Sequence, residues 1–267
     1  MNKIFRKSVF IIFGVLNITF TSQLFAQTAS PINMQLYILA GQSNMAGRGP
    51  ITEEYASINH PNVYMLDKNN QWVQAKHPLH FDKPSVAGVG PGLAFAIKMA
   101  EANPNIQIGL IPCAVGGTSI TSWKQSGFDK ATNTHPYDDA VARIKIAMLS
   151  GTIKGILWHQ GESDSNPQAI STYLNKLSTL IISLRQEIGN EKIPVVIGEL
   201  GPYKENYRSF NTELQKVTGF IHYCAVASSA SLTDKGDVTH FNSKSASIMG
   251  ERMAEQMLLI QKQYKNN

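Results

Sequence analysis

The sequence predicts an α/β fold, a three-layer α/β/α sandwich in which helices cover both faces of a mainly parallel sheet. Short apolar runs rich in β-forming residues recur along the chain, and such runs are typical of strands buried on both faces. Stretches with helical periodicity lie between most of these runs, which favours parallel strands joined by helices. No internal repeat, low-complexity segment or linker divides residues 27–267, so we expect them to form one domain.

Six runs are expected to form the strands. The first, residues 36–40, is continuously apolar and ends at Gly41, where the backbone can turn sharply. The segment 71–84, rich in His and Pro, is expected to be a polar loop. The other expected strands are residues 62–67, 106–112, 153–158, 194–198 and 221–228.

Five helices are expected between and after these strands. Pro91 and Pro167 each suit the first turn of a helix, because proline lacks the N–H that a first turn leaves unpaired. In the last helix, Met249, Met253 and Met257 recur at spacings of four residues, which places them on one apolar face. The expected helical ranges are 91–102, 137–149, 167–188, 205–216 and 243–264.

Residues 1–26 have the pattern of a cleavable signal peptide. A basic start precedes a mostly apolar stretch, residues 8–20, which is short for a membrane span, and Ala26 ends a cleavage-site pattern. We therefore expect a periplasmic or extracellular protein with no stable membrane anchor after cleavage. An uncleaved anchor is the alternative, although no stop-transfer pattern follows.

The basic character of the chain belongs largely to this leader. The whole chain carries a formal net charge of +5, with 24 Lys and Arg against 19 Asp and Glu. Lys3, Arg6 and Lys7 are the charged residues before position 27, so removing them leaves 21 basic residues and a net charge of +2. That small excess gives no support for nucleic-acid binding.

The chain has two cysteines, Cys113 and Cys224. In an oxidising compartment, a disulfide is the default interpretation. However, both residues lie at or within strand-like runs that we place several strands apart, and neighbouring strands are separated by about 4.8 Å. Because a disulfide needs Cα atoms within roughly 7 Å of each other, we expect two buried free thiols.

Ser43 comes just after the first expected strand, at the edge where open α/β sheets bind ligands. It is either a turn or helix-cap residue, or a nucleophile that needs a base, an orienting acid and oxyanion donors from elsewhere. Gly117, Gln160 and the loop 237–240 also follow expected strands. Because parallel strands end at one edge, these residues can converge on Ser43 although they are distant in sequence.

Four blocks occur in chain order: Gly41–Gly47 (Gly-Gln-Ser-Asn-Met-Ala-Gly), Gly116–Ser119 (Gly-Gly-Thr-Ser), Trp158–Asp164 (Trp-His-Gln-Gly-Glu-Ser-Asp) and Asp237–His240 (Asp-Val-Thr-His). Together they resemble SGNH-type hydrolases. They are most similar to the branch that contains sialate O-acetylesterases and the acetyl xylan esterases of carbohydrate esterase family 6. The third block usually supplies an Asn in the superfamily, whereas the acetylesterase branch shares the Gln-Gly-Glu form seen here. The resemblance implies the SGNH, flavodoxin-like fold.

The resemblance also implies a catalytic machinery. Ser43 would be the nucleophile, His240 the general base and then the acid, and Asp237 the carboxylate that fixes the histidine tautomer. The developing oxyanion would receive hydrogen bonds from the Ser43 N–H, the Gly117 N–H and the Gln160 side-chain amide. Without the other blocks, Asp237 and His240 would be interpreted as surface-turn residues and Gln160 as a strand end.

Gly116 and Glu162 are expected to support this site. We prefer Gly117 to Gly116 as the donor, because Gly-x-Ser recurs at this position in related esterases. Glu162 is expected to play a structural part by capping a helix or binding a neighbouring group, with a direct catalytic role as the alternative. Arg48 either contacts substrate or pairs with an acid, and Trp123 either stacks on a sugar face or packs in the interior.

Serine chemistry needs no metal or cofactor, and none is expected. His159, Glu162 and Asp164 lie close in sequence, but their spacing matches no recognised metal motif. His77 and His80 are interpreted as loop residues rather than ligands. We therefore expect the site to consist of protein side chains and backbone groups, without a metal ion or a cofactor.

The resemblance implies a secreted serine carbohydrate esterase that removes O-acetyl groups from a polysaccharide or sugar through an acetyl-enzyme. A polysaccharide substrate is favoured because Gly41–Gly49 and Pro112–Ser119 look most like the acetyl xylan esterases, while a sialate O-acetylesterase is the alternative. A non-catalytic carbohydrate-binding protein on the same fold is the alternative from another class, although Ser43, Asp237 and His240 are all present. The sequence leaves open the sugar, the acetyl position and the oligomeric state.

Overall fold

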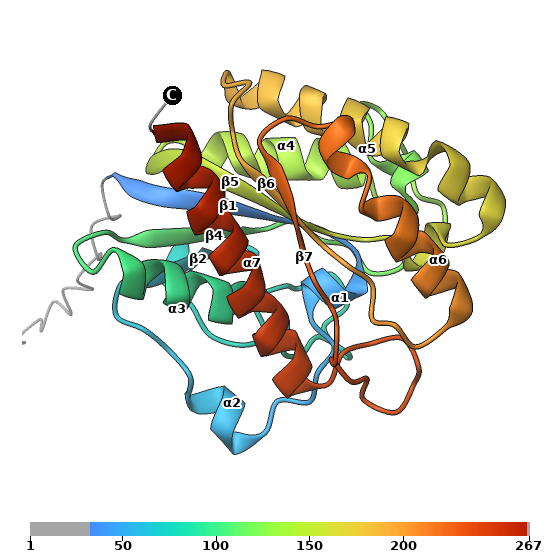
Figure 1. Ribbon diagram of the computed structural model, residues 1–267. Coiled ribbons are helices and arrows are strands. Elements are labelled where there is room, and N and C mark those ends of the chain that lie inside the picture. The colour runs from blue at the N-terminus through green and yellow to red at the C-terminus, as the bar shows by residue number, and fades with distance from the viewer. Residues whose placement is uncertain (1–32, 266–267) are drawn as a thin grey trace, which may run out of the picture.

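The strand β1 (Met34–Gly41) lies at the centre of a seven-stranded sheet in the computed structural model, which describes residues 33–265 (Figure 1). The other strands are β2 (Val63–Leu66), β3 (Trp72–Gln74), β4 (Ile108–Pro112), β5 (Gly151–His159), β6 (Val195–Gly198) and β7 (Cys224–Ala227). They are arranged in the order β3-β2-β4-β1-β5-β6-β7. β3 pairs antiparallel with β2, and all the other pairs are parallel.

The helices connect these strands across both faces of the sheet. Within the described residues, the α-helices are α1 (Ser43–Ala46), α2 (Glu53–Ser57), α3 (Gly92–Ala102), α4 (Pro136–Ala147), α5 (Pro167–Ile188), α6 (Glu205–Leu214) and α7 (Ser243–Lys265). The five longer helices confirm the expected ones, with every boundary within two residues. Pro167 occupies the predicted first-turn position, and Pro136 occupies one in α4, whereas Pro91 lies just before α3 as its N-cap residue. Gly189 ends α5 in the left-handed conformation typical of a helix C-terminus.

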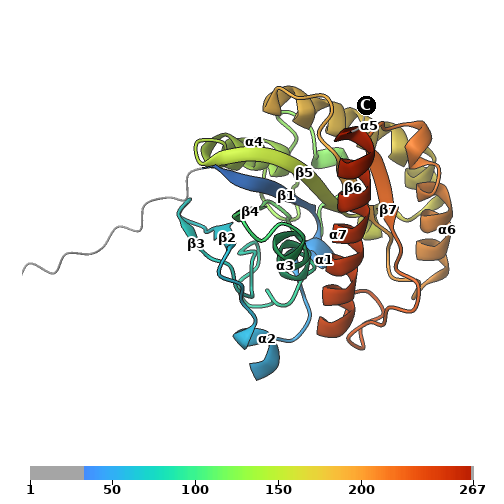
Figure 2. The same cartoon turned by 60° about the vertical axis from the view of Figure 1, so that its left-hand side comes forward.

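Alternate residues of β1 pack against opposite helical layers. Leu36, Ile38 and Ala40 belong to a buried cluster with residues of α4, α5 and α6. Tyr37 and Leu39 belong to a second cluster with residues of α3 and α7, which lie side by side on the other face (Figures 1 and 2). Because side chains of a strand alternate with a period of two, a continuously apolar strand serves both layers. The predicted three-layer α/β/α sandwich is confirmed.

The main differences from expectation concern short elements. The expected polar loop 71–84 contains β3, which has three residues and lies at the sheet edge with Val73 and Gln74 exposed. A three-residue strand is too short for alternation to be recognised in the sequence. The last strand is also shorter than the expected 221–228, because only Cys224–Ala227 pairs with β6. The short helices α1 and α2 were not among those expected.

Both cysteines are free, as predicted. Cys113 follows β4 and Cys224 lies in β7, with three other strands between them. Cys113 is buried, whereas Cys224 is only half-buried, which corrects the expectation of two buried thiols. Burial raises the pKa of the Cys113 thiol to about 12 and that of Cys224 to about 11, so both thiols stay protonated near neutral pH.

The predicted signal peptide, residues 1–26, lies outside the described residues. Within residues 33–265, none of the helices combines the length and apolar character that a bilayer span requires. All seven strands of the described residues belong to one sheet. The assignment of residues 27–267 to a single domain stays a prediction.

Candidate active site

Ser43 lies at the carboxyl end of the central strand. The chain leaves β1 towards β2–β4 on one side of the sheet and later continues with β5–β7 on the other, so the sheet has its switch point beside β1. Gly41 ends the strand with a φ of 130° and lies against the backbone of His159, where any side chain would clash. The turn delivers Ser43 as the first residue of α1, with a relative exposure of 7%.

A chain of hydrogen bonds links Ser43, His240 and Asp237. Nε2 of His240 lies 2.9 Å from Oγ of Ser43, and Nδ1 of His240 lies 2.7 Å from Oδ2 of Asp237. Because a carboxylate can only accept, Nδ1 of His240 carries the proton and Nε2 is left to accept from the serine hydroxyl. The structure thus brings together two segments 197 residues apart in the geometry of a nucleophile, a base and an orienting acid.

The Asp237 carboxylate is held in its ionised form. Partial burial acts to raise its pKa, but hydrogen bonds from the His240 N–H, the His240 ring and the Thr239 N–H outweigh this and lower the pKa to about 2. A permanently ionised carboxylate keeps the proton of the histidine on Nδ1 and favours the imidazolium whenever it forms.

The loop that carries these two residues is shaped by Asp234. Its Oδ2 accepts hydrogen bonds from the Gly236 N–H at 2.8 Å and from the Val238 N–H at 2.6 Å. Val238, between Asp237 and His240, has a φ of 57°, a left-handed conformation that is unusual for a β-branched residue. This tight turn brings the carboxylate back onto the imidazole ring across only three residues.

Asn44 fixes both neighbours of His240. Its Oδ1 accepts from the Phe241 N–H at 3.0 Å, while its Nδ2 donates to the Thr239 carbonyl at 3.0 Å and to Oε1 of Glu162 at 2.5 Å. Glu162 therefore contacts the site through Asn44, and its supporting role stays a prediction. Asn44 was not among the expected site residues, although it lies inside the first block, next to Ser43.

Two backbone N–H groups at the site, those of Ser43 and Gly117, are unpaired within the described residues. The Gly116 N–H, in contrast, donates to Oδ2 of Asp82 at 2.8 Å. Gly117 has a φ of 92°, which suits glycine. A Cβ on Gly116 would lie 3.3 Å from Cβ of Ser43 and would clash with the guanidinium of Arg48, so this turn needs glycine to approach the serine.

The expectation for Gln160 is corrected. Its side chain is fully buried, and Nε2 lies 2.6 Å from Oδ2 of Asp164, 3.0 Å from Oε1 of Gln42 and 3.1 Å from the Thr118 carbonyl. Its Oε1 accepts from the Tyr173 hydroxyl at 2.9 Å. An amide has two N–H groups, and these three acceptors already compete for them. Gln160 is therefore part of a buried network and is not a free donor facing Ser43.

Arg48 and Trp123 are both interior residues. Arg48 forms an ion pair with Asp82 at 2.6 Å, with side-chain exposures of 4% and 2%. This favours pairing with an acid over contact with substrate. Trp123 is 2% exposed, donates from its indole N–H to Oγ1 of Thr118 and packs edge-on against Trp158. It offers no ring face to a sugar and instead supports the segment that carries Gly117.

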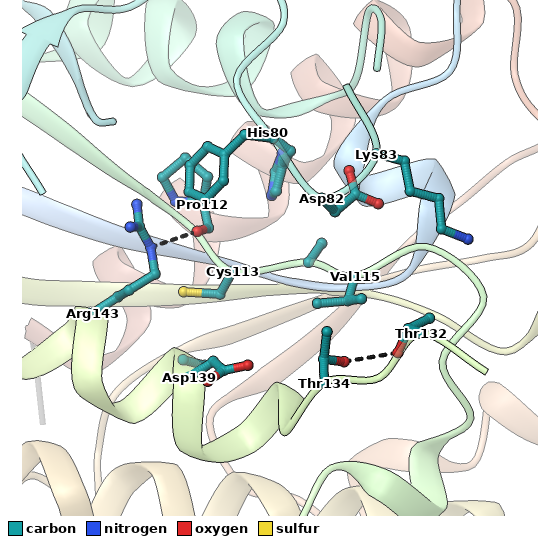
Figure 3. Close-up of a pocket in the computed structure, with 13 residues that line it drawn as sticks. His80, Asp82, Lys83, Pro112, Cys113, Val115, Thr132, Thr134, Asp139 and Arg143 are labelled. Atoms are coloured by element: carbon teal, nitrogen blue, oxygen red, sulfur yellow. Dashed lines mark hydrogen bonds between the residues drawn. The ribbon is translucent and has the colours of Figure 1, made fainter. Parts of the chain in front are cut away.

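A cavity of about 270 Å³ lies beside this turn, over the end of β4. The segment Cys113–Val115 forms one wall, and Thr132, Thr134 and Arg143 line another part of it (Figure 3). Lys83 also lines it, and the Lys83 amine would lie 3.7 Å from a Cβ placed on Gly117. In the described part of the chain this amine has no hydrogen bond or ion pair. The cavity thus combines apolar walls with threonine hydroxyl groups and an amine that lies close to Gly117.

Metal ligands are not gathered anywhere in the described part of the chain. Between residues 33 and 265, no group of three or more His, Cys, Asp and Glu side chains is arranged to hold a metal ion. Burial lowers the pKa of both His77 and His80 to about 4, so each is a neutral interior side chain near neutral pH.

Comparison with known proteins assigns this chain to a family. Residues 33–259 match the family model described as "Carbohydrate esterase, sialic acid-specific acetylesterase". The chain is 32% identical over 258 residues to a probable carbohydrate esterase of Arabidopsis thaliana, an alignment that covers 87% of this chain and 93% of the plant protein.

Solved structures agree with this assignment. The crystal structure of the Arabidopsis thaliana protein superposes with a TM-score of 0.76 at 28% identity and covers 86% of this chain and 99% of that one. NanS superposes with a TM-score of 0.68 at 17% identity, covering 88% and 99% of the two chains, so it shares the fold. The chain therefore belongs to the family described as "Carbohydrate esterase, sialic acid-specific acetylesterase".

Proposed function

We propose that this carbohydrate esterase removes O-acetyl groups from a polysaccharide or sugar through a Ser43–His240–Asp237 triad and an acetyl-enzyme. The observation that carries the proposal is the unbroken chain of hydrogen bonds from Oγ of Ser43 to the carboxylate of Asp237, at 2.9 Å and 2.7 Å. A serine hydroxyl is a weak nucleophile on its own, and this arrangement is what activates it.

In the first half of the reaction, Oγ of Ser43 attacks the acetyl carbonyl carbon and its proton passes to Nε2 of His240. The oxygen of the resulting tetrahedral intermediate carries the negative charge, and the free N–H groups of Ser43 and Gly117 are available to bind it. When the intermediate collapses, the bond to the sugar oxygen breaks, and the proton on Nε2 moves to that oxygen. The sugar leaves and Ser43 is acetylated.

In the second half, water replaces the sugar. His240 takes a proton from water as the hydroxide oxygen attacks the acetyl-enzyme, and it returns that proton to Oγ of Ser43 as acetate leaves. Asp237 remains ionised throughout and stabilises the imidazolium in both halves. No external acid, base or cofactor is needed to balance either step.

The cavity beside Gly117 is a suitable place for the sugar. Its lining includes Val115, two residues before Gly117, and Lys83, whose amine lies near Gly117, so the sugar ring of a substrate would lie among Thr132, Thr134 and Lys83. Hydroxyl and ammonium groups match the hydroxyl-rich edge of a sugar, and the apolar segment Cys113–Val115 matches its C–H face. An acetylated polysaccharide such as xylan is our first candidate. O-acetyl sialic acid is the second, supported by the description of the family.

Export is the remaining part of the proposal. The pattern of residues 1–26 supports a secreted or periplasmic enzyme that meets its substrate outside the cytoplasm.

Acetate release tests the proposal. The purified chain without residues 1–26 is given an aryl acetate, an aryl ester of a long acyl chain, acetylated xylan and O-acetyl sialic acid. We expect turnover of the aryl acetate well above that of the long-chain ester, and release of acetate from the xylan. Preference for O-acetyl sialic acid would select the second substrate. A well-folded protein that releases no acetate but still binds glycan would favour the non-catalytic carbohydrate-binding alternative.

Asn44 supplies a prediction about positioning. Asn44→Ala removes the two hydrogen bonds that hold the residues on either side of His240, together with the one to Glu162. We expect kcat to fall by about 10²-fold with little change in KM, because a small misplacement of a catalytic group has this cost. Steady-state kinetics on the aryl acetate measure it.

The matched control for Asn44 is Asn206→Ala. Asn206 donates to Oγ of Ser165 and touches none of the triad residues. We expect this variant to keep near-normal kcat. A wild-type kcat in Asn44→Ala would contradict the positioning role.

A further inference from the structure

Gln42, the residue before the nucleophile, has a buried side-chain amide beside the turn that follows β5. Its relative exposure is 3%. Its Oε1 accepts hydrogen bonds from Nε2 of Gln160 at 3.0 Å, from the Ser163 N–H at 3.3 Å and from the Gly161 N–H at 3.5 Å. The same turn contacts Gly117, because Oγ of Ser163 donates to the Gly117 carbonyl. Ser163 therefore links the amide of Gln42, which adjoins Ser43 in sequence, to Gly117.

These contacts decide which way the amide points. The N–H groups of Gly161 and Ser163 can only donate, so the atom facing them must be the oxygen of Gln42 and not its nitrogen. Rotating the amide by half a turn would set N–H against N–H. The opposite arm of the amide, Nε2 with its two protons, is directed away from the turn.

Nε2 of Gln42 has no acceptor among the residues the structure describes. It is also absent from the fully buried, unpartnered side-chain atoms found in this part of the chain, so it reaches solvent. A nearly buried donor without a partner is costly, and such groups concentrate where a ligand or a reaction supplies the missing acceptor. The N–H groups of Ser43 and Gly117 are equally without partners among the described residues. Ser43 is the residue after Gln42, and the Gly117 carbonyl accepts from Ser163, whose N–H Gln42 binds.

We propose that the side-chain amide of Gln42, and not that of Gln160, is the third hydrogen-bond donor to the oxyanion. The inference rests on the proposed esterase function. Gln160 then acts as a positioning residue, because its Nε2 helps to hold Oε1 of Gln42 and so keeps the amide in the orientation that leaves Nε2 of Gln42 available to a ligand. The third donor of the site comes from the first block, one residue from the nucleophile.

The test uses a near-isosteric change. Gln42→Glu keeps an oxygen for the N–H groups of Gly161, Ser163 and Gln160 but removes both donors. We expect kcat for the aryl acetate to fall by about 10²- to 10³-fold, with KM and melting temperature close to those of the wild type. Affinity for an acetyl-sized phosphonate that mimics the tetrahedral intermediate should fall by the same factor as kcat. If Gln42 had only a structural role, the losses in kcat and in phosphonate affinity would not match.

A second variant separates donor loss from added charge. Gln42→Met has a similar length and neither donors nor charge, and we expect it to lose activity on the same scale. A loss confined to Gln42→Glu would mean that a new carboxylate repels the oxyanion, and it would overturn the inference. Wild-type kcat in both variants would also overturn it.

Ser43→Ala distinguishes this inference from the proposed function. If Ser43→Ala is inactive and both Gln42 variants are fully active, the esterase mechanism stands and the role of Gln42 is rejected. If Ser43→Ala is fully active, the proposed function itself fails.

Discussion

We expect Ser43→Ala to lower kcat for acetate release by at least about 10⁴-fold without unfolding the protein. The variant lacks the oxygen that forms the acetyl-enzyme, while the free backbone donors remain and allow only weak residual catalysis. Removing one hydroxyl from a small side chain leaves no large cavity, so we expect the melting temperature to change little. Initial rates on the aryl acetate and on the acetylated glycan measure the effect.

Ser171→Ala is the matched control for this loss. Ser171 is an exposed serine on α5 whose hydroxyl donates only to the Gln168 carbonyl, so this variant should keep wild-type rates. Equal rates in wild type and Ser43→Ala would reject Ser43 as the nucleophile and bring the carbohydrate-binding alternative forward.

Asp237→Asn is expected to lower kcat by about 10⁴-fold with KM nearly unchanged. An amide at this position can donate to Nδ1 of His240, which would transfer the ring proton to Nε2 and leave nothing to accept the proton of Ser43. The wild-type carboxylate has its pKa lowered from 3.8 to about 2, so it is ionised throughout the usual assay range. The deficit should therefore persist from about pH 4 to about pH 8.

The lowered pKa of Asp237 also determines how folding stability depends on pH. Because this pKa is lower in the folded protein than in the unfolded chain, the carboxylate stabilises the fold above about pH 4 and loses that contribution as the pH falls through about 2.

Asp234→Asn is the control for the activity of Asp237→Asn, since Asp234 shapes the same loop without contacting His240. If Asp234→Asn lost as much activity as Asp237→Asn, loop shape and not the contact with His240 would explain the effect.

Much of the fold is predictable because its signals are long and repeated. The apolar run of β1 has to be buried on both faces, and the alternation of strands with long amphipathic helices leaves few arrangements other than a parallel sheet. β3 escapes because a three-residue strand at an exposed edge has no periodicity. The half-buried state of Cys224 escapes for a related reason, since exposure at a sheet edge depends on which strands and helices cover it.

In the candidate site, some residues could be placed from the sequence and others could not. Ser43, His240 and Asp237 were predictable because each residue type has a chemical role that few others can take, and the structure brings them within hydrogen-bond distance. The assignment of Gln160 failed because a side-chain amide at a strand end can turn either into the site or into the interior. Which way it turns depends on Asp164 and Thr118, which are buried acceptors that block order alone does not reveal.

Asn44 and Gln42 illustrate what pattern reasoning leaves out. Both flank the nucleophile in the first block, yet their contacts lie in the turn after β5 and in the loop that carries His240. Such contacts are set by how three loops meet above the sheet. Only after the loops are placed does the division between orienting, donating and supporting side chains become visible.

The most direct test of the triad is covalent labelling by an acetyl-sized aryl phosphonate, which a serine nucleophile attacks but cannot readily release. Peptide mapping then locates the phosphonyl group, and residual activity is followed in parallel. We expect one phosphonyl group per chain, on Ser43, with activity falling in proportion to labelling and no labelling in Ser43→Ala. Full activity with Ser43 labelled, or inactivation that tracks labelling of another residue, would contradict it.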